Sequence, residues 1–203
     1  SNSFKKLKIG LDCANGASWN IANAVFSALG AQTYVIGNEP DGLNVNEGCG
    51  STHIEKLQQL VREKHLDLGF AFDGDADRCL AVDECGNEVD GDFIMAILAS
   101  KLKKEGKLTK NAVVGTVMTN FGFTKFCEEN GIRFIATKVG DKYVLEEMLL
   151  EDHSFGGEQS GHIIFRDISK AGDGQLTALQ VLSLMKRSGR SLRDLASVMT
   201  VYP

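Results

Sequence analysis

Apolar residues along this chain fall into short β-type runs that alternate with segments of helical spacing. The runs LKIGLDCA, QTYVIG and LDLGFAF are typical of strands, and LDLGFAF is uninterrupted enough to predict a strand buried on both faces. Between them, apolar residues recur every three or four positions, which predicts helices that cover a sheet. This order of elements favours an α/β fold with largely parallel strand pairing.

The helical segments also predict which residues face the core. The first segment ends at Gly30, which suits a left-handed C-terminal cap. Thr52 and Glu55 form a capping-box pattern at the start of the second segment. The buried faces that we expect are Ile21, Ala24, Val25, Ala28 and Leu29 for the first helix, and Ile54, Leu57 and Val61 for the second.

A second series of strands and helices begins after the turn CGN. Its strands lie in AVVGTVM, IRFIATKV and GGEQSGHIIF, and Phe123, Phe126 and Cys127 mark a short helix between the first two. Two similar series predict two tandem three-layer α/β/α domains of related topology, with mixed, mainly parallel sheets. We place these domains at 4–87 and 88–203, after a short cloning remnant. No clear cap follows the last predicted helix, so we expect a piece of a longer chain.

Charge and composition argue against several classes of protein. The sequence has 203 residues, a net charge of −5 and no basic excess, so we expect no nucleic-acid partner. No apolar segment reaches the roughly 18 residues that span a bilayer, and SNSFKKLKIG lacks the apolar core of a signal peptide. The five cysteines form no C-x-x-C pair, which favours reduced, packed thiols. We therefore expect a cytoplasmic protein without a membrane partner.

The stretch FAFDGDADR ends a predicted strand in three aspartates at alternate positions, Asp73, Asp75 and Asp77, followed by Arg78. Alternate residues of an extended segment point the same way, so the three carboxylates could converge on one point. A hard divalent cation would offset their repulsion, and Mg²⁺ with a phosphate would use both the carboxylates and the guanidinium. A solvated acidic turn without a metal is the alternative.

A calcium loop of the EF-hand type shares this aspartate spacing, with Glu84 at the twelfth position. Such a loop requires glycine at its sixth position, where this chain has Arg78. It also requires a helix on each side, whereas both flanks here are strand-like. The EF-hand interpretation therefore fails.

Further loops carry polar groups at predicted strand ends. GGEQSGH contains Glu158, Ser160 and His162 and suits a polyhydroxylated ligand, while a turn that caps its own backbone is the simpler alternative. KVGDKY places Lys138 after a strand and Asp141 at a helix start, where an N-cap and an anion site are both open. The acidic residues for which we expect only structural roles are Asp12, which braces a turn, and Asp173, which caps a helix.

Taken together, these motifs resemble a known family. DCANGA, FAFDGDADR, VDGDFIMAILA, VVGTVMTNFGF, KVGDKYVLEEM, GGEQSGHIIF and GDGQLTALQVL occur in this order in the α-D-phosphohexomutase superfamily. GEQSGH, DGDADR and GTVMTN together are similar to its phosphoglucosamine mutase branch. The resemblance covers essentially the whole chain and implies the second and third of the family's four domains. Domains I and IV of the same polypeptide would then be its missing partners.

The resemblance implies a Mg²⁺-dependent isomerase that interconverts glucosamine 6-phosphate and glucosamine 1-phosphate, on the route to UDP-N-acetylglucosamine and the bacterial cell wall. It assigns Asp73, Asp75 and Asp77 to the metal. It assigns Arg78 to charge stabilisation beside a phosphoserine, which lies in the family's first domain. The residues that it implies for binding the phosphosugar are Glu158, Ser160, His162, Lys138 and Asp141.

Two positions depart from this branch, and they keep other interpretations open. Ala76 stands where glycine is frequent, and Lys142 stands where arginine is usual. The first departure leaves a phosphomannomutase or phosphoglucomutase as an alternative, and a non-catalytic sugar-phosphate or metal-binding module is the alternative from another class. The family's phosphoserine and phosphate-clamping loops are not found here. We therefore expect the chain alone to lack mutase activity and to bind Mg²⁺ weakly.

Overall fold

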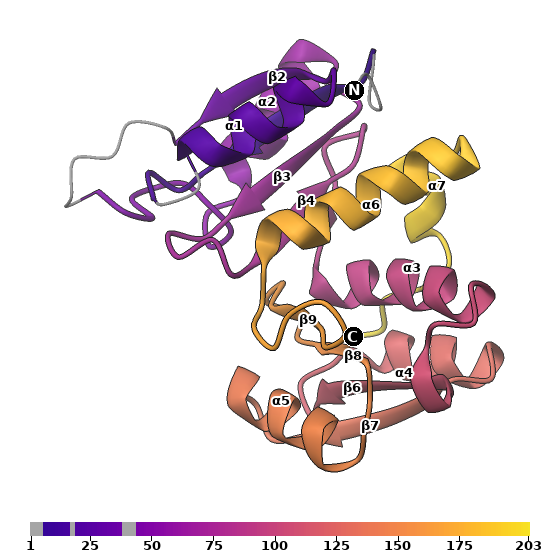
Figure 1. Cartoon of the computed structure of the whole chain (residues 1–203). Helices are drawn as coiled ribbons and strands as arrows, with labels where there is room; N and C mark the ends of the chain where they lie inside the picture. Colours follow the sequence, from indigo (N-terminus) through magenta and orange to yellow (C-terminus); the bar gives the residue numbers. More distant parts are fainter. Residues whose placement is uncertain (1–5, 17–18, 38–43) are drawn as a thin grey trace.

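Two β-sheets with helices on both faces make up the part of the chain that the structure describes (Figure 1). The structure is a computed structural model and describes residues 6–16, 19–37 and 44–203. Both sheets are mixed, which confirms the predicted fold class.

The first sheet has the strand order β2-β1-β3-β4-β5. β1 pairs in parallel with β2 and β3, whereas β4 pairs antiparallel with both β3 and β5. Its strands are β1 (Lys8–Asp12), β2 (Gln32–Ile36), β3 (Leu68–Phe72), β4 (Cys79–Val82) and β5 (Glu88–Val89). Every residue of β3 is buried, as its apolar run predicts, because helices cover both faces of this central strand.

The second sheet has the order β7-β6-β8-β9 and repeats part of this plan. β6 pairs in parallel with β7 and β8, and β8 pairs antiparallel with β9. Its strands are β6 (Ala112–Thr116), β7 (Arg133–Thr137), β8 (Phe155–Gly157) and β9 (Ile163–Phe165). Each sheet thus has three parallel strands followed by an antiparallel one, which is the related topology that the sequence predicts.

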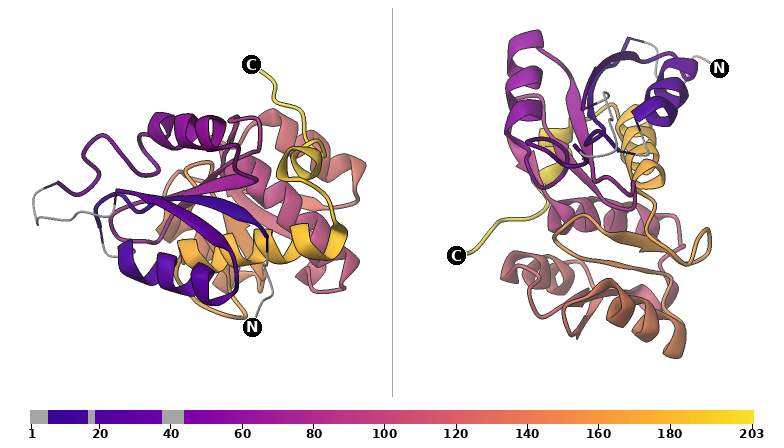
Figure 2. Two further views of the ribbon diagram at one scale, coloured as in Figure 1. Left: turned by 90° about the horizontal axis from the view of Figure 1, so that it is seen from above. Right: turned by 90° about the vertical axis from the view of Figure 1, so that its left-hand side faces the viewer.

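The helices form layers on both sides of each sheet. Their bounds in the described part are α1 (Trp19–Ala28), α2 (Glu55–Lys64), α3 (Gly91–Lys104), α4 (Phe121–Glu129), α5 (Asp141–Leu150), α6 (Gly174–Ser188) and α7 (Leu192–Ala196). α1 and α6 cover one face of the first sheet and α2 covers the other (Figure 2). α3 and α4 cover one face of the second sheet and α5 the other. None of these helices combines the length and apolar character needed to cross a membrane.

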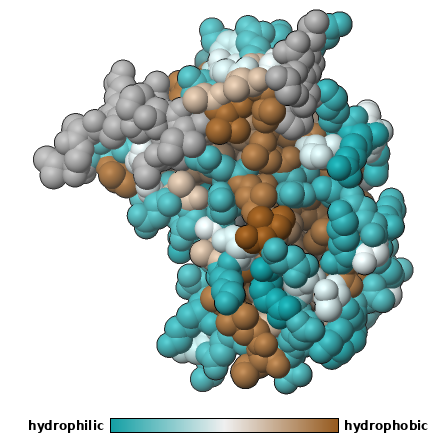
Figure 3. All heavy atoms as spheres, viewed as in Figure 1, coloured by the Kyte–Doolittle hydropathy of each residue, from teal (hydrophilic) through white to brown (hydrophobic). Residues whose placement is uncertain are grey.

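One large cluster of buried apolar side chains reaches both sheets. It includes Phe70 of β3, Ile94 of α3, Phe155 of β8 and Leu182 of α6. α6 follows the second sheet in sequence but packs on β3 and β4 of the first, so the two halves share a core. On the face seen in Figure 3, hydrophobic residues form a narrow band between hydrophilic surfaces. The buried cysteines are Cys13, Cys49, Cys79 and Cys127, as expected for packed thiols, whereas Cys85 is exposed.

The buried face of α1 differs from the predicted one. Ala22 and Phe26 are buried instead. Ala24 and Ala28 are exposed, so these two positions of the predicted face are wrong, whereas Leu29 packs against the core as expected. The ring of Phe26 stacks on a phenylalanine of β3 with a centroid distance of 6.3 Å, and its large apolar area decides the orientation of the helix. The side chain of Ile21 lies outside the described residues.

The start of α2 also corrects the sequence analysis. Its N-cap residue is Ile54, and no side chain caps it, so the capping box of Thr52 and Glu55 does not form. Its buried stripe is nevertheless confirmed, because Ile54, Leu57 and Val61 pack beneath the helix against the first sheet. Apolar spacing was thus the stronger signal for this helix.

The shared core predicts that both sheets unfold together. Ile94→Ala should lower the free energy of unfolding by about 2 to 5 kcal/mol, because this fully buried side chain leaves a cavity in the cluster that joins the sheets. We expect one urea transition, followed both by far-UV circular dichroism and by the fluorescence of the single tryptophan, Trp19. The control Leu150→Ala, at a side chain 72% exposed, should change stability by less than about 0.5 kcal/mol. Two separate transitions would contradict a shared core.

Candidate functional site

The aspartate loop, residues 73–78, closes the hairpin between β3 and β4. Asp73 is only 8% exposed, and it organises the loop from within. Its Oδ1 accepts hydrogen bonds from the backbone N–H groups of Asp77 at 3.1 Å and Arg78 at 3.2 Å. The loop therefore wraps around one of its own carboxylates.

Asp73 and Asp77 bring two carboxyl groups into contact. Burial, together with the hydrogen bond to Asp77, raises the pKa of Asp73 to about 6. The same hydrogen bond lowers the pKa of Asp77, with help from the nearby His162. Arg78 offsets little of this charge, because its Nε lies 3.9 Å from Asp73 Oδ2 and its side chain is 44% exposed to the screening solvent. Above about pH 6 the pair therefore carries excess negative charge.

The chemistry of this pair fits a hard cation. Oδ1 of Asp77 is buried and has no hydrogen-bond partner in the described part of the chain. A divalent ion would satisfy this oxygen and offset its repulsion from Asp73. Asp75 is exposed, and within residues 6–16, 19–37 and 44–203 no three His, Cys, Asp or Glu side chains are grouped to hold a metal. The three-aspartate metal site thus stays a prediction, supported by two of its members.

The aspartate loop pairs directly with the GEQSGH turn, residues 157–162. Arg78 and His162 form an antiparallel β-bridge, and the N–H of Cys79 donates to the carbonyl oxygen of Gly161 at 3.0 Å. Gly161 has a φ of +93°, and a side chain there would lie 2.3 Å from that cysteine's carbonyl oxygen, so only glycine allows this approach. Two loops that are far apart in sequence, and that contain most of the predicted site residues, are therefore joined through their backbones.

His162 lies between two acidic side chains at this junction. It is 6% exposed, and its Nδ1 lies 3.7 Å from Asp77 Oδ2 while its Nε2 lies 3.7 Å from Asp141 Oδ2. Gly172 packs against the ring, since an added side chain would lie 2.6 Å from its Cε1. The imidazole thereby links the aspartate loop to the first residue of α5.

A cavity of about 350 Å³ opens beside the paired loops. Predicted site residues that line it are Arg78, Asp141, Glu158 and Ser160. Glu158 is held in place, because its Oε1 accepts a hydrogen bond from the N–H of Gly140 at 3.0 Å. One guanidinium, two carboxylates and a serine hydroxyl around one cavity suit a phosphorylated, hydroxyl-rich ligand.

The end of β6 and the loop after it line the same cavity through Thr116 and Met118, which sequence reasoning did not single out. Their position at the carboxyl end of a parallel strand was the available signal, because ligand sites gather at that edge. Hydrogen bonds within the loop fix its shape, with the N–H of Met118 donating to Thr116 Oγ1 at 3.1 Å.

The first turn of α3 supports two walls of this cavity. The N–H of Gly91 donates to the Gln159 carbonyl at 2.9 Å, and Gln159 Nε2 donates to Asp90 Oδ2 at 3.3 Å. On the other side, the N–H of Asn120 donates to Asp92 Oδ2 at 2.9 Å. Asp92 is fully buried, its Oδ1 has no partner among the described residues, and burial raises its pKa to about 7. The GEQSGH turn and the β6–α4 loop therefore share one anchor.

Lys138 and Asp141 have different surroundings. Lys138 does not line the 350 Å³ cavity; its Nζ lies 5.7 Å from the ring centroid of Tyr143, beside another cavity of about 410 Å³. Asp141 lines the first cavity but does not cap α5, whose N-cap is Gly140 without a side-chain bond, so the N-cap alternative is wrong.

Two aspartates have the structural roles that we expected. Asp173 caps α6 by accepting from the N–H of Leu176 at 3.1 Å. Asp12 braces the DCANGA turn by accepting from the N–H of Ala14 at 3.0 Å, and also reaches the N–H of Gly50 at 2.7 Å. Both predictions are confirmed.

Comparison with known families gives two adjacent matches. Residues 1–86 match the model for "Phosphoglucomutase/phosphomannomutase, alpha/beta/alpha domain II", and residues 90–202 match the model for domain III. Curated proteins named phosphoglucosamine mutase are 58% identical over 200 residues in Acetivibrio thermocellus and in Clostridium kluyveri. In both cases the match covers 98% of this chain and 44% of the relative, so the chain spans less than half of their length.

Solved structures share the fold. A phosphoglucomutase/phosphomannomutase family protein from Burkholderia thailandensis matches with a TM-score of 0.83 at 25% identity, covering 95% of this chain and 42% of the other. An N-acetylphosphoglucosamine mutase from Aspergillus fumigatus, solved with GlcNAc-6P and magnesium, matches with a TM-score of 0.78 at 19% identity. That match covers 98% of this chain and 50% of the other, and at this identity it speaks for the fold alone.

The buried carboxyl of Asp92 predicts a pH-dependent stability. Because folding raises its pKa to about 7, its contribution is fully present below pH 4 and is lost as the pH rises through 7. Asp92→Asn removes this titration. As the pH rises from 4 to 8, the wild type loses this contribution and the variant does not. The unfolding free energy of the variant minus that of the wild type should therefore increase by roughly 2 to 4 kcal/mol. Denaturant titrations across this range measure the difference.

A matched control at an exposed carboxyl isolates the effect of burial. Asp167→Asn replaces an exposed aspartate and should leave the pH profile of stability unchanged. If the unfolding free energies of Asp92→Asn and the wild type changed with pH in the same way, the result would contradict a raised pKa of Asp92 in the folded chain.

Proposed function

This chain belongs to the phosphoglucomutase/phosphomannomutase family, and on this basis we propose that it is the central part of a phosphoglucosamine mutase. The proposed reaction interconverts glucosamine 6-phosphate and glucosamine 1-phosphate by phosphoryl transfer through a phosphoserine elsewhere on the same polypeptide. The observation that carries the proposal is the backbone pairing of the aspartate loop with the GEQSGH turn beside one polar cavity. The relatives of that name support the choice of an amino sugar.

The aspartate loop is the proposed Mg²⁺ site. Asp73 and Asp77 would supply ligand oxygens from their adjoining carboxylates, and Asp75 would add a third from its exposed position. When bound, the ion supplies positive charge that stabilises a transferring phosphoryl group. The buried, unpartnered Oδ1 of Asp77 supports this assignment, because an oxygen in that state gains most from a cation.

Arg78 and His162 have separate proposed roles beside the ligand. Arg78 lines the cavity with an exposed guanidinium, which would bind and orient a phosphate through paired hydrogen bonds. His162 is buried between Asp77 and Asp141 and would hold both carboxylates in position. Because a phosphate group is repelled by these carboxylates, their fixed positions would limit the orientations in which the phosphosugar can bind.

The GEQSGH turn is the proposed sugar-recognition loop. One oxygen of Glu158 accepts from the Gly140 N–H, which leaves the other oxygen for a sugar hydroxyl, and Ser160 adds a hydroxyl to the same cavity. Because both groups bind hydroxyls rather than phosphate, they would hold the sugar in either of two orientations. A bisphosphorylated intermediate could then present each phosphate in turn. Lys138 lies outside the cavity lining and stays a prediction from the family motif.

The longer protein is also part of this proposal. Residues 4–87 and 88–203 would be the second and third of four domains, joined to domains I and IV of the same polypeptide; the start at residue 4 lies outside the described residues. Such an enzyme would act in the bacterial cytoplasm, where precursors of UDP-N-acetylglucosamine and peptidoglycan are made. A phosphomannomutase or phosphoglucomutase is the alternative function, which Ala76 in the aspartate loop leaves open.

Substrate preference in the longer protein tests the proposed reaction. We expect a higher kcat/KM for glucosamine 6-phosphate than for mannose or glucose phosphates, measured side by side with Mg²⁺ present. The purified 203-residue chain should convert none of them, because the phosphoserine lies outside it. A preference for mannose or glucose phosphates would favour the alternative function. Activity of the 203-residue chain alone would contradict the proposal that the phosphoserine lies elsewhere on the polypeptide.

Metal binding can be measured on the 203-residue chain itself. Mg²⁺ should shift the backbone amide resonances of residues 73–78 in a saturable titration. Asp75→Ala should weaken that binding by about tenfold or more, because it removes one anionic ligand. The control Glu128→Ala removes an exposed carboxylate on α4 and should leave the affinity unchanged. Equal titrations for both variants would count against the aspartate loop as the metal site.

A further inference from the structure

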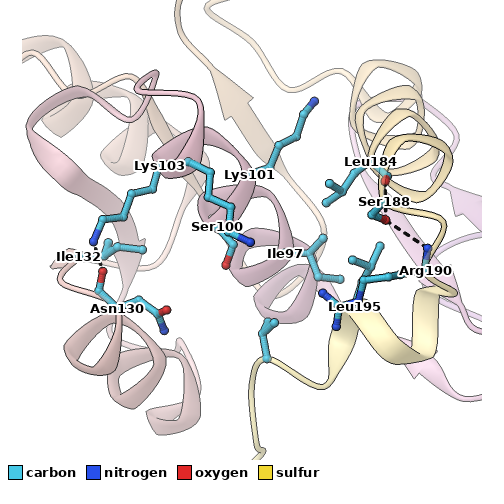
Figure 4. Close-up of a pocket in the computed structure, with 12 residues that line it drawn as sticks. Ile97, Ser100, Lys101, Lys103, Asn130, Ile132, Leu184, Ser188, Arg190 and Leu195 are labelled. Carbon is cyan, nitrogen blue, oxygen red and sulfur yellow. Dashed lines mark hydrogen bonds between the residues drawn. The ribbon is translucent and has the colours of Figure 1, made fainter.

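A larger cavity lies at the opposite end of α3 from the candidate site (Figure 4). Its volume is about 550 Å³, within the range of roughly 300–1,000 Å³ that holds small molecules in proteins. α3 begins at Gly91 against the GEQSGH turn, and residues of its second half, including Ser100 and Lys104, line this cavity. We name it the α3 groove; its other walls come from the α4–β7 connection, α6 and residues 190–198.

The inner surface of the α3 groove is aliphatic. Ile97 of α3, Ile132 before β7 and Leu195 of α7 are almost fully buried and form its floor. Leu184 of α6 and Val198 are half-buried and form its sides, and Figure 4 shows Ile97, Leu184 and Leu195 converging on the space between α3 and α6. An occupant therefore gains free energy by burying an apolar body there.

All charged side chains that line the groove are cationic. They are Lys101, Lys103, Lys104 and Arg190, in a chain whose net charge is −5. No aspartate or glutamate is among the lining residues. A local excess of positive charge around an apolar floor selects an anionic head group over a neutral or cationic one.

The partners of these cations show where an anion would sit. Lys101 is buried and donates to the neutral Gln180 Oε1 at 2.7 Å, and Figure 4 shows it leaving α3 on the side opposite to Lys103. Arg190 is already paired, with Nε 2.7 Å from the Asp194 carboxylate.

Lys103 and Lys104 form the more available pair. Lys103 donates to the backbone carbonyl of Asn130, which leaves two of its ammonium protons, and Lys104 forms no hydrogen bond or ion pair with any described residue. The rim at Lys103 and Lys104 is therefore the anion-binding end of the groove.

We propose that the α3 groove binds a small amphiphilic anion, with a carboxylate, sulfonate or phosphate-monoester head at Lys103 and Lys104 and an aliphatic or aromatic body on Leu184 and Leu195. The two halves of this site reinforce each other, because the aliphatic floor lowers the local dielectric beside the ammonium groups. The proposal is independent of the mutase reaction, since the groove contains none of the candidate site residues.

Three probes separate the contributions of charge and apolar body. Octanoate, 1-octanol and acetate are titrated into the ¹⁵N-labelled 203-residue chain, and amide shifts are followed by NMR. Octanoate should shift the amides of Ser100, Asn130 and Ser188 in a saturable way. Acetate and 1-octanol should bind about tenfold or more weakly, because each lacks one of the two interactions. Equal binding of 1-octanol, or shifts scattered over the surface as for an adventitious additive only, would overturn the proposal.

Two charge-reversal variants localise the head group. Lys104→Glu should weaken octanoate binding by about tenfold or more while leaving that of 1-octanol unchanged. Lys64→Glu makes the same change on the exposed last turn of α2, away from the groove, and should have no effect. Dispersed amide spectra show that both variants are folded. Equal octanoate affinity in the two variants would place the anion elsewhere and refute the site.

Discussion

The antiparallel pairing of Arg78 with His162 is the contact on which the candidate site depends. It joins the β3–β4 hairpin of the first sheet to the β8–β9 turn of the second through the backbone itself. Backbone hydrogen bonds have one register, so the pairing determines at once where the aspartates, the histidine and the cavity lie. Gly161 makes it possible, because a side chain there would collide with the Cys79 carbonyl. The shared core beneath α3 and α6 then keeps the two sheets in that register.

Around this contact the fold buries carboxyl groups that would be more stable in water. Burial raises the pKa of both Asp73 and Asp92, and among the described residues neither has a cationic side chain within hydrogen-bond distance. Backbone hydrogen bonds offset part of the cost of burying these carboxyl groups. Asp73 accepts hydrogen bonds from two N–H groups of its own loop, and Asp92 accepts one from the N–H of Asn120. Fixed amide dipoles hold the loops in shape but do not cancel a full charge. Negative charge that is not fully offset in this way lowers the stability of the folded chain.

Strands and helix faces that are defined by burial could be predicted from the sequence. Contacts between segments that are distant in the sequence could not. β3 was identified as a doubly covered strand, and the stripe of α2 was correct, because apolar periodicity records burial directly. The orientation of α1 was predicted incorrectly, because the spacing of its alanines suggested one buried face. The larger Phe26 instead packs against β3, and this contact turns a different face of the helix toward the sheet. The capping box at Thr52 failed because the helix begins at Glu55, and its N-cap residue, Ile54, provides no side-chain cap. The family motifs assigned the aspartate and GEQSGH loops to one site, but the backbone register that pairs them, and the support from Asp92 and Met118, arise only when the sheets come together.

α3 links the two regions of the molecule that differ most in chemistry. Its first turn anchors the polar loops of the candidate site, and its second half borders an aliphatic groove with a cationic rim. A helix of 14 residues is about 21 Å long, so an occupant of the groove would touch the same helix that anchors the loops of the candidate site. Such an occupant binds the folded chain and not the unfolded one, and therefore stabilises the shared core by mass action. Because the groove is built from α3, α6 and α7, that stabilisation would act on the helical layer between the sheets, the layer that keeps the two loops paired.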